Sequence, residues 1–286
     1  MSTTIEKAHT LSEALPYIQK YHGKTMVIKY GGGAMQSDEL CHQVISDVVL
    51  LSLVGIRVVV VHGGGPEVNE FLAKIGKEPR FVNGLRYTDE ETMEAVQMVL
   101  CGRVSKLLAQ LIGEQGGRAL SLSGMDGRMF VAKKLEAQED LGFVGELTHV
   151  DPEPVNHALA GGYIPVVSTV ACGEEPGQLY NINADTGAAR LAIAVGAEKL
   201  ILLTDVRGIL RDPADESTLI PEVRLADIPK LEASGIISGG FIPKVQCRAE
   251  VVRGGVPRAH ILDGRVPHAI LIELLSDMGV GTMIYA

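Results

Sequence analysis

The chain has 286 residues, of which 46% are apolar, 21% charged and 4% aromatic, and its formal net charge is −9. This length suits one large α/β domain or two fused lobes. The acidic charge and the few aromatic side chains argue against a nucleic-acid-binding protein. No run reaches the roughly 18 uninterrupted apolar residues of a membrane span, and residues 1–9 lack a signal-peptide core, so we expect a cytoplasmic protein.

Residues 3–21 predict an amphipathic helix, with Leu11, Leu15 and Ile18 on one stripe and Pro16 as the site of a kink or break. Strand-like and helix-like segments then alternate. The predicted strands are 25–30, 57–61, 118–122, 128–132, 164–168, 199–204 and 259–262. The predicted helices are 37–54, 66–75, 90–114, 152–161, 184–196, 225–233, 244–253 and 267–276. This alternation favours a three-layer α/β/α sandwich around a central, mostly parallel sheet.

Three irregular features complete the pattern. Residues 133–150 predict a β excursion or hairpin, and residues 172–179 mark a weak seam between two lobes. The four cysteines (Cys41, Cys101, Cys172 and Cys247) lie far apart in the sequence. Since no CxxC pattern is present, we expect free, mostly buried thiols and no metal centre built on them.

Two glycine-rich turns carry the strongest chemical signal. Each follows an apolar, strand-like run: residues 26–30 lead into Gly31-Gly32-Gly33, and residues 58–62 lead into Gly63-Gly64-Gly65. Glycine lets the backbone N–H groups approach a ligand, and the helix start that follows adds a positive dipole end. Two such turns predict two anionic groups held close together. Lys29, just before the first turn, favours phosphoryl transfer over storage of an anion.

Two segments offer side chains that can hold an acidic substrate. In residues 83–89, Arg86 is a bidentate fork for a carboxylate or a surface arginine, and Thr88 or Asp89 caps the following helix. In residues 181–186, Asp185 orients lysines or holds Mg²⁺ through water, or the segment is an Asx turn with a helix cap.

Two later segments point to a nucleotide. Residues 200–210 form a buried strand and a turn, and ligands of open α/β sheets sit beyond such strand ends. Residues 236–243 form a further glycine turn, which leads to Lys244 at a helix start. A lysine there is unfavourable beside the helix dipole unless an anion compensates it. A solvated surface lysine is the alternative.

Along the chain these motifs follow one another at residues 29–32, 62–66, 83–86, 181–185, 203–209 and 239–244. Together they resemble the motifs of the N-acetylglutamate kinases of the amino acid kinase superfamily, over residues 24–286. The resemblance implies a carbamate kinase-like fold with an oligomerisation helix at 1–23 and a kinase domain at 24–286. In that domain, the N-lobe (24–175) would bind the acyl amino acid and the C-lobe (176–286) would bind ATP.

The implied reaction is the ATP-dependent, Mg²⁺-assisted phosphorylation of the γ-carboxylate of N-acetyl-L-glutamate to N-acetyl-L-glutamyl 5-phosphate. This is the second step of arginine biosynthesis by the acetylated pathway. No general base is needed, because the γ-carboxylate, with a pKa of about 4, is ionised at neutral pH. Gly33, Tyr87 and residues 187–190 depart from the family pattern beside the site, which bears on kinetics rather than on the reaction class.

The resemblance also implies residue roles. Lys29 and Lys244 would stabilise the transferring phosphoryl group, and Asp185 would orient both lysines. The substrate would bind at Gly64, Gly65, Arg86, Asn181 and Asn183, with Arg86 on its α-carboxylate. Phosphate and ATP would bind at Gly32, Gly33, Thr204, Asp205, Gly208, Ile209, Leu210, Ile236, Ile237 and Ser238.

The two chain ends resemble the arginine-sensitive branch of the family. There, Tyr17, His268, Glu273, Gly279 and Gly281 would form a site for arginine as feedback inhibitor. The N-terminal helix would join three dimers into a homohexamer, and a nitrogen-signalling regulatory protein would be a further partner. An ordinary terminal helix packed on its own domain is the alternative.

Two other functions stay open from the sequence. The chain could phosphorylate another acylated or free amino acid, such as N-acetyl-aminoadipate or glutamate, or a relative's substrate such as aspartate, carbamate or uridylate. It could also be a non-catalytic arginine sensor, although both lysines and Asp185 are present.

Overall fold

The computed structural model describes residues 4–31, 37–239, 241–277 and 279–286. Within these residues, the centre is an eight-stranded sheet in the order β14-β16-β15-β11-β1-β2-β8-β5, parallel except for the β15–β16 pair. Its strands are β1 (Thr25–Tyr30), β2 (Arg57–His62), β5 (Ala119–Ser123), β8 (Ile164–Ser168), β11 (Lys199–Thr204), β14 (Glu222–Arg224), β15 (Arg258–Asp263) and β16 (Thr282–Tyr285). The predicted, mostly parallel sheet is confirmed.

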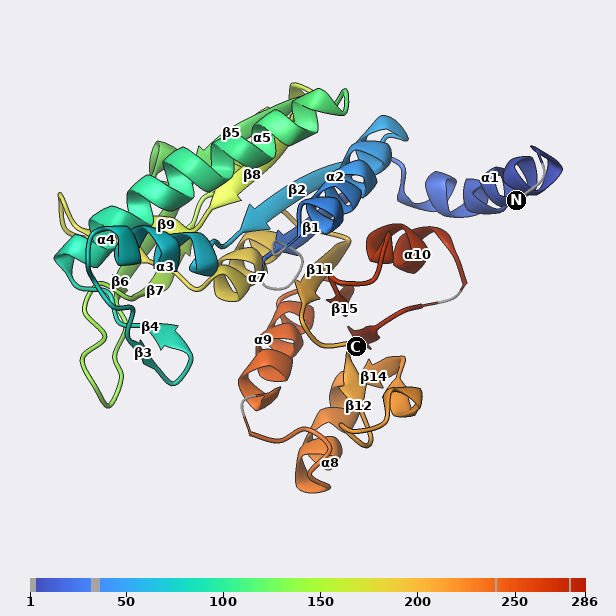
Figure 1. Ribbon diagram of the computed structural model, residues 1–286. Helices are drawn as coiled ribbons and strands as arrows, with labels where there is room; N and C mark the ends of the chain where they lie inside the picture. Colours follow the sequence, from blue (N-terminus) through green and yellow to red (C-terminus); the bar gives the residue numbers. More distant parts are fainter. Residues whose placement is uncertain (1–3, 32–36, 240, 278) are drawn as a thin grey trace.

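Helices cover both faces of this sheet (Figure 1). One face carries α2 (Asp38–Leu53), α3 (Gly65–Lys74), α4 (Glu90–Gln97), α5 (Ser105–Glu114) and α10 (Ala269–Leu275). The other carries α6 (Glu153–Ala160), α7 (Ala184–Ala194), α8 (Ile228–Ala233) and α9 (Phe241–Arg253). Neighbouring strand residues alternate between the two cores: Ile28 packs in the first and Val27 in the second. The predicted three-layer sandwich is therefore confirmed.

A four-stranded sheet in the order β10-β9-β6-β7 extends the structure beside the main one. It contains β6 (Phe130–Lys134), β7 (Gly145–Val150), β9 (Val170–Gly173) and β10 (Leu179–Asn181). The predicted hairpin in 133–150 is the antiparallel β6–β7 pair. The seam at 172–179 is the turn of the β9–β10 hairpin, in which Leu179 pairs with Cys172.

The remaining elements are short. Two small hairpins are β3 (Phe81–Val82) with β4 (Leu85–Arg86), and β12 (Ile209–Leu210) with β13 (Leu219–Ile220). Three 3₁₀ turns span Asp126–Arg128, Glu216–Thr218 and Leu225–Asp227. The predicted longer elements are all present, with ends that differ by at most three residues, and the predicted helix at 225–233 begins with the last of these turns. The short strands were not predicted, because stretches of two to four residues carry no readable periodicity.

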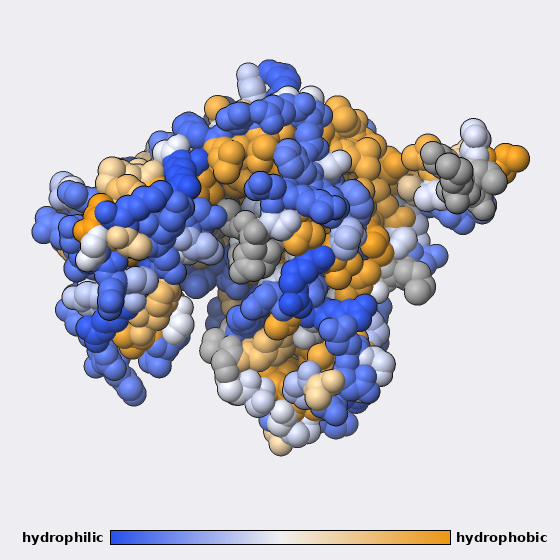
Figure 2. Space-filling view, viewed as in Figure 1, coloured by the Kyte–Doolittle hydropathy of each residue, from blue (hydrophilic) through white to orange (hydrophobic). Residues whose placement is uncertain are grey.

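Helix α1 (Thr4–Tyr21) projects from the body of the molecule (Figure 1). Pro16 lies inside it and the helix continues across the proline, so of the two predicted alternatives, a kink or a break, the break does not occur. Leu11 and Leu15 are 75% and 52% exposed, and Figure 2 shows apolar side chains on this projection. The last residue, Tyr21, is instead buried in the first core. The helix is thus anchored at its C-terminal end and presents an uncovered apolar stripe.

The predicted helix at 90–114 is one helical run with an unusual middle. Between α4 and α5, residues Met98–Val104 form a π-helical segment. The whole run, Glu90–Glu114, has the length and apolar content of a membrane-crossing helix. A single such helix is weak evidence for a membrane span, and here α5 packs on β5 and β8 as a core helix does.

Candidate active site

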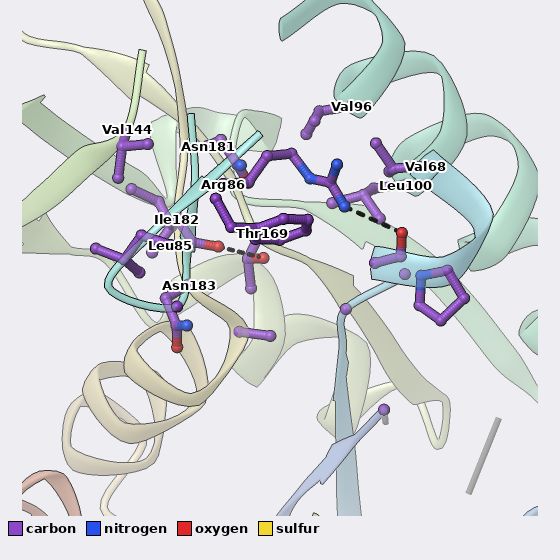
Figure 3. A pocket seen from close by; sticks show the side chains of 18 of the residues that line it. Val68, Leu85, Arg86, Val96, Leu100, Val144, Thr169, Asn181, Ile182 and Asn183 are labelled. Carbon is purple, nitrogen blue, oxygen red and sulfur yellow. Dashed lines mark hydrogen bonds between the residues drawn. The ribbon is translucent and has the colours of Figure 1, made fainter. Parts of the chain in front are cut away.

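A cavity of ≈ 290 Å³ lies at the carboxyl ends of β1 and β2. Polar walls come from Lys29, Arg86, Asn181 and Asn183, backbone from residues 63–65, and apolar walls from Val68, Val96, Leu100 and Val144 (Figure 3). Every residue that the sequence analysis assigned to the acyl amino acid therefore lines this one cavity. Its elements come from distant parts of the chain, and the parallel sheet brings their ends together.

The second glycine turn forms one wall and starts α3. Gly64 is the N-cap residue, and a Cβ there would lie 2.6 Å from Cδ2 of Leu100. A larger residue at this position would require the Leu100 side chain, in the π-helical segment, to move. Residues 63–65 and the N-terminal end of α3 line the cavity, and the positive dipole end of a helix suits an anionic ligand.

His62 holds this turn from behind. It is fully buried; Nδ1 donates to the Gly63 carbonyl over 2.7 Å, and Nε2 lies 2.7 Å from Oγ of Ser105. Burial lowers the pKa of His62 to about 4, against the weaker effect of the Gly63 carbonyl. The imidazole is therefore neutral at physiological pH and acts as a structural link between the glycine turn and α5.

Arg86 adjoins this glycine turn, and part of its guanidinium has no partner in the part of the chain that the structure describes. Nη2 donates to the Gly65 carbonyl over 3.0 Å, and the guanidinium lies 4.7 Å from the ring centre of Phe81. Nη1 is buried without a hydrogen-bond partner in the described residues, and burial lowers the pKa of the group. A buried, unpaired donor is costly unless a ligand accepts from it. This geometry favours the carboxylate fork over a surface arginine.

A short network fixes the floor of the cavity. Thr88 donates its hydroxyl to the Arg86 carbonyl over 2.9 Å, and Nδ2 of Asn181 donates to Thr88 over 3.3 Å. Gly142 approaches Thr88 so closely, at a φ of +69°, that a Cβ would lie 2.1 Å from its carbonyl oxygen. Asp89, not Thr88, caps α4, since its side chain accepts from the N–H of Thr92.

Asn183 caps α7 in the same region. Its side-chain oxygen accepts from the N–H groups of Asp185 and Thr186 at 2.9 and 3.2 Å. The Asx-turn interpretation of this motif is thus borne out, and it is compatible with a ligand role, because Asn183 also lines the cavity. The cap points the positive end of α7 at the site.

Charged groups meet at the end of the cavity next to β1. Nζ of Lys29 lies 3.0 Å from Oδ1 of Asp185, and Oδ2 of Asp185 lies 3.4 Å from Nη2 of Arg248. Burial alone would raise the pKa of Asp185, but Lys29 and then Arg248 hold it below its usual value. Lys244, in the first turn of α9, acts on this carboxylate through its charge, without an ion pair at 4 Å or less.

The nucleotide candidates lie in the second half of the chain. Thr204 ends β11, where its hydroxyl donates to the Val206 carbonyl over 3.0 Å, and Asp205 and Gly208 lie in the turn that leads to β12. Ile209 and Leu210 form β12, and residues 236–238 precede α9. Ile209 and Ile237 are each 1% exposed, so only their backbone can face a ligand. Gly32 and Gly33 lie outside the described residues.

The residues expected to form the arginine site lie near α10, but their side chains contact different residues. Tyr17 donates its hydroxyl to Asp277, and Nδ1 of His268 lies 2.6 Å from Oδ1 of Asp47. Glu273 accepts from His260 at 2.8 Å and from the Val280 N–H at 3.0 Å. A Cβ on Gly279 would lie 3.3 Å from this carboxylate, and one on Gly281 would lie 2.0 Å from the Ile261 carbonyl. Helices α1 and α10 are in contact.

The described residues contain no group of three or more His, Cys, Asp or Glu side chains arranged to hold a metal ion. All four cysteines are free thiols, as predicted, but each is partly exposed, so the expectation that they are mostly buried is wrong. A metal ion for this site would therefore have to be held largely by a ligand's own oxygens, such as those of a polyphosphate.

Sequence reasoning missed three residues of the site: Ser105, Thr88 as a link to Asn181, and Arg248. Arg248 lies one helical turn after Lys244, so it shares a helix face with that lysine. That spacing was a readable signal. Ser105 and Thr88 carry none, because their partners are distant in the sequence.

Comparison with known proteins agrees with this geometry. The amino acid kinase family matches residues 24–263. The acetylglutamate kinase of Clostridium beijerinckii is 56% identical over 98% of this chain and 98% of its own length. The N-acetylglutamate synthase of Neisseria gonorrhoeae, solved with coenzyme A and N-acetyl-glutamate, has a TM-score of 0.84 at 25% identity, covering 98% of this chain and 63% of that one.

Two more solved structures are similar. The same synthase with coenzyme A and L-arginine has a TM-score of 0.80 at 24% identity, covering 97% of this chain and 65% of that one. A Giardia carbamate kinase shares the fold, with a TM-score of 0.67 at 17% identity, over 92% of this chain and 99% of that one. The chain thus spans about two thirds of the synthase and the full length of the kinases. It belongs to the acetylglutamate kinases of the amino acid kinase family.

Proposed function

We propose that this chain transfers the γ-phosphoryl group of ATP to the γ-carboxylate of N-acetyl-L-glutamate, in the second step of arginine biosynthesis. One observation carries the proposal: a single cavity is lined both by Arg86, which has a buried donor that is unpaired within the described residues, and by Lys29, which forms an ion pair with Asp185. A dicarboxylate fits such a cavity, with one carboxylate on each cation. The family of the chain and its acetylglutamate kinase relatives support this choice.

In this proposal Arg86 binds the α-carboxylate through the free Nη1 and thereby sets the direction of the substrate. The turn that carries Gly64 and Gly65 adjoins Arg86, and its backbone amides would add donors for the substrate. Asn181 and the Nδ2 of Asn183 are the polar groups nearest the acetamido group. The apolar wall of Val96, Leu100 and Val144 leaves room for its methyl group.

An oxygen of the γ-carboxylate attacks the γ-phosphorus of ATP. The new O–P bond forms as the bond to the β-phosphate oxygen breaks, so ADP leaves and an acyl phosphate remains. The nucleophile is already ionised, so the protein supplies position and charge rather than a base. Lys29 and Lys244 neutralise the charge that builds up as the two anions approach, and the N-terminus of α7 adds a positive dipole end.

ATP would lie along residues 204–210 and 236–238, with its phosphates toward Lys244 and the first glycine turn, Gly32 and Gly33. Mg²⁺ would enter as part of the MgATP substrate and draw charge from the phosphates. The 24–175 and 176–286 lobes would then be the amino acid and nucleotide units. Each supplies four strands of the eight-stranded central sheet within the described residues.

Arginine feedback is a second element of the proposal. Arginine would bind where α1 meets α10, near Tyr17, His268, Glu273, Gly279 and Gly281. The neighbouring fold of the Neisseria synthase was solved with L-arginine, which supports looking for that ligand here. The exposed stripe of α1 would pair across a two-fold axis and close three dimers into a hexamer. The cytoplasm is the proposed compartment, and a nitrogen-signalling protein is a further proposed partner.

A substrate panel in a coupled ADP-release assay tests the function. N-acetyl-L-glutamate should give the highest kcat/KM, ahead of N-acetyl-aminoadipate, glutamate, aspartate, carbamate and uridylate. A higher kcat/KM for another acceptor would replace the proposed substrate. Absence of turnover with every acceptor, combined with arginine binding, would favour the non-catalytic sensor.

A further inference from the structure

Arg248 is the largest side chain among the fully buried residues, with 1% of its surface exposed. A guanidinium keeps its charge under all physiological conditions, so burying it is costly unless an anion pairs with it. Its anionic partner within the described residues is Asp185, at 3.4 Å between Nη2 and Oδ2. Nε of Arg248 is buried and has no partner in the described part of the chain.

The same guanidinium also reaches its own helix. Nη1 donates to the carbonyl oxygen of Lys244, one turn earlier in α9. Arg248 therefore links the first turn of α9, which carries Lys244, to the first turn of α7, which carries Asp185. The two helices pack against each other, α7 over β1 and β11 and α9 over β15 and β16.

The carboxylate of Asp185 is divided between two cations. Oδ1 faces Lys29 from β1, and Oδ2 faces Arg248 from α9. A carboxylate held at one oxygen can rotate, whereas one held at both is fixed. Lys29, Lys244 and Arg248 surround this single carboxylate, so the cluster keeps an excess of positive charge toward the cavity.

We propose that Arg248 is a positioning residue for phosphoryl transfer. It fixes the orientation of the Asp185 carboxylate toward Lys29, and through the Lys244 carbonyl it fixes the position of Lys244 relative to that carboxylate. Arg248 does not touch the substrate. It acts through Asp185 and through the backbone of α9, so that both lysines meet the transferring group in one geometry. This inference rests on the proposed kinase function and adds a residue to it.

Replacing Arg248 by Met keeps the volume and removes the charge. We expect Arg248→Met to lower kcat by about 10- to 100-fold, the scale of a small misplacement of reacting groups. KM for N-acetyl-L-glutamate should stay near the wild-type value, because Arg86 and the glycine turn are untouched. Arg248→Lys, which keeps a charge but loses the fork, should give an intermediate kcat. Arg253→Met, at an exposed position of the same helix, is the matched control and should not change kcat.

A double-mutant cycle separates positioning from simple packing. If Arg248 acts through Asp185, Asp185→Asn combined with Arg248→Met should be no slower than Asp185→Asn alone, within about twofold. Multiplied losses, or a wild-type kcat in Arg248→Met, would overturn the inference. If Arg248→Met does not give a wild-type circular dichroism spectrum, the same cycle is run with Arg248→Lys. Wild-type protein without N-acetylglutamate-dependent ADP release would instead overturn the proposed function, so the two failures are distinct.

Discussion

Lys29 and Asp185 form an ion pair, 3.0 Å between Nζ and Oδ1, where β1 meets the first turn of α7. The two side chains are only 13% and 21% exposed. Partial burial weakens the screening of their charges by water, so this pair exerts a stronger field than a surface pair. The field is directed at the end of the cavity where the proposed phosphoryl transfer takes place.

Removing either lysine should slow the chemical step. We expect Lys29→Ala and Lys244→Ala each to lower kcat by roughly 10²-fold, since each removes a preorganised charge from the transition state. KM for N-acetyl-L-glutamate should change less. Steady-state ADP release measures both constants, and Lys230→Ala, at an exposed site of α8, is the control. Near-wild-type kcat in both lysine variants would remove them from the phosphoryl site.

Arg86→Lys should mainly raise KM for N-acetyl-L-glutamate. A lysine cannot both hold the Gly65 carbonyl and offer a second donor in the fork geometry. The control is Arg80→Lys, an exposed arginine that stacks on Tyr87 outside the cavity. A rise in KM for ATP alone would place Arg86 elsewhere.

Asp185→Asn should lower kcat and leave the fold intact. The amide cannot neutralise Lys29 or Arg248, so the cations repel one another and lose their alignment. Thermal melting and ADP release measure the two effects separately. Glu250→Gln, an exposed acid on α9, controls for the loss of one negative charge. Full activity of Asp185→Asn would show that the lysines are aligned without it.

Asp89 gives a stability prediction with a defined pH window. Burial alone would raise its pKa, but hydrogen bonds from Lys77 and Thr92 lower it from 3.8 to about 2. A lowered folded-state pKa stabilises the fold above the ordinary value, and this contribution is lost as the pH falls through the lower value. At pH 7, Asp89→Ala should cost about 1 kcal/mol of unfolding free energy, as loss of a helix N-cap does.

The difference between wild type and Asp89→Ala should then shrink as the pH falls from 3.8 toward 2. Urea unfolding at several pH values measures it, with the exposed Glu94→Ala on the same helix as control. A difference that stays constant below pH 3.8 would mean that Asp89 stabilises α4 without its charge.

Helix α1 should control assembly. A chain that starts at Tyr17 keeps the buried Tyr21 but loses the exposed Leu11 and Leu15. We expect dimers in place of hexamers, with weakened arginine inhibition and normal turnover without arginine. Light scattering and an arginine titration test the two parts. A full-length protein that is dimeric and indifferent to arginine would contradict the regulatory proposal and leave the kinase unaffected.

The sequence predicted the fold well because its signals are local. Apolar runs such as 57–61 and 199–204 are typical of buried strands in a parallel sheet, and each is followed within a few residues by a glycine. The continuation of α1 across Pro16 was missed, because a proline costs one hydrogen bond that the rest of a long helix can offset. Strands such as β12 and β13 were missed because they exist only by pairing with each other.

The residues of the site were predictable from the sequence, but the ion pairs that they form were not. Lys29, Arg86 and Asn181 stand in recognisable motifs, and they do line one cavity. That Asp185 faces Arg248, while Lys244 makes no ion pair with it, depends on how α7 packs on α9. A rotation of α9 by a fraction of a turn determines which of its two neighbouring cations, Lys244 or Arg248, pairs with Asp185. Sequence periodicity does not resolve such a rotation.

The π-helical segment Met98–Val104 determines in which direction around the helix axis the side chains of the following helix α5 point. Its wide turn holds one residue more than a regular α-helical turn would. Deleting a single residue there would restore the α-helix and turn Ser105 by about 100° around the axis. Ser105 would then leave His62, and the glycine turn would lose its support from behind. One extra residue in this helical run is thus a requirement for the shape of the cavity wall.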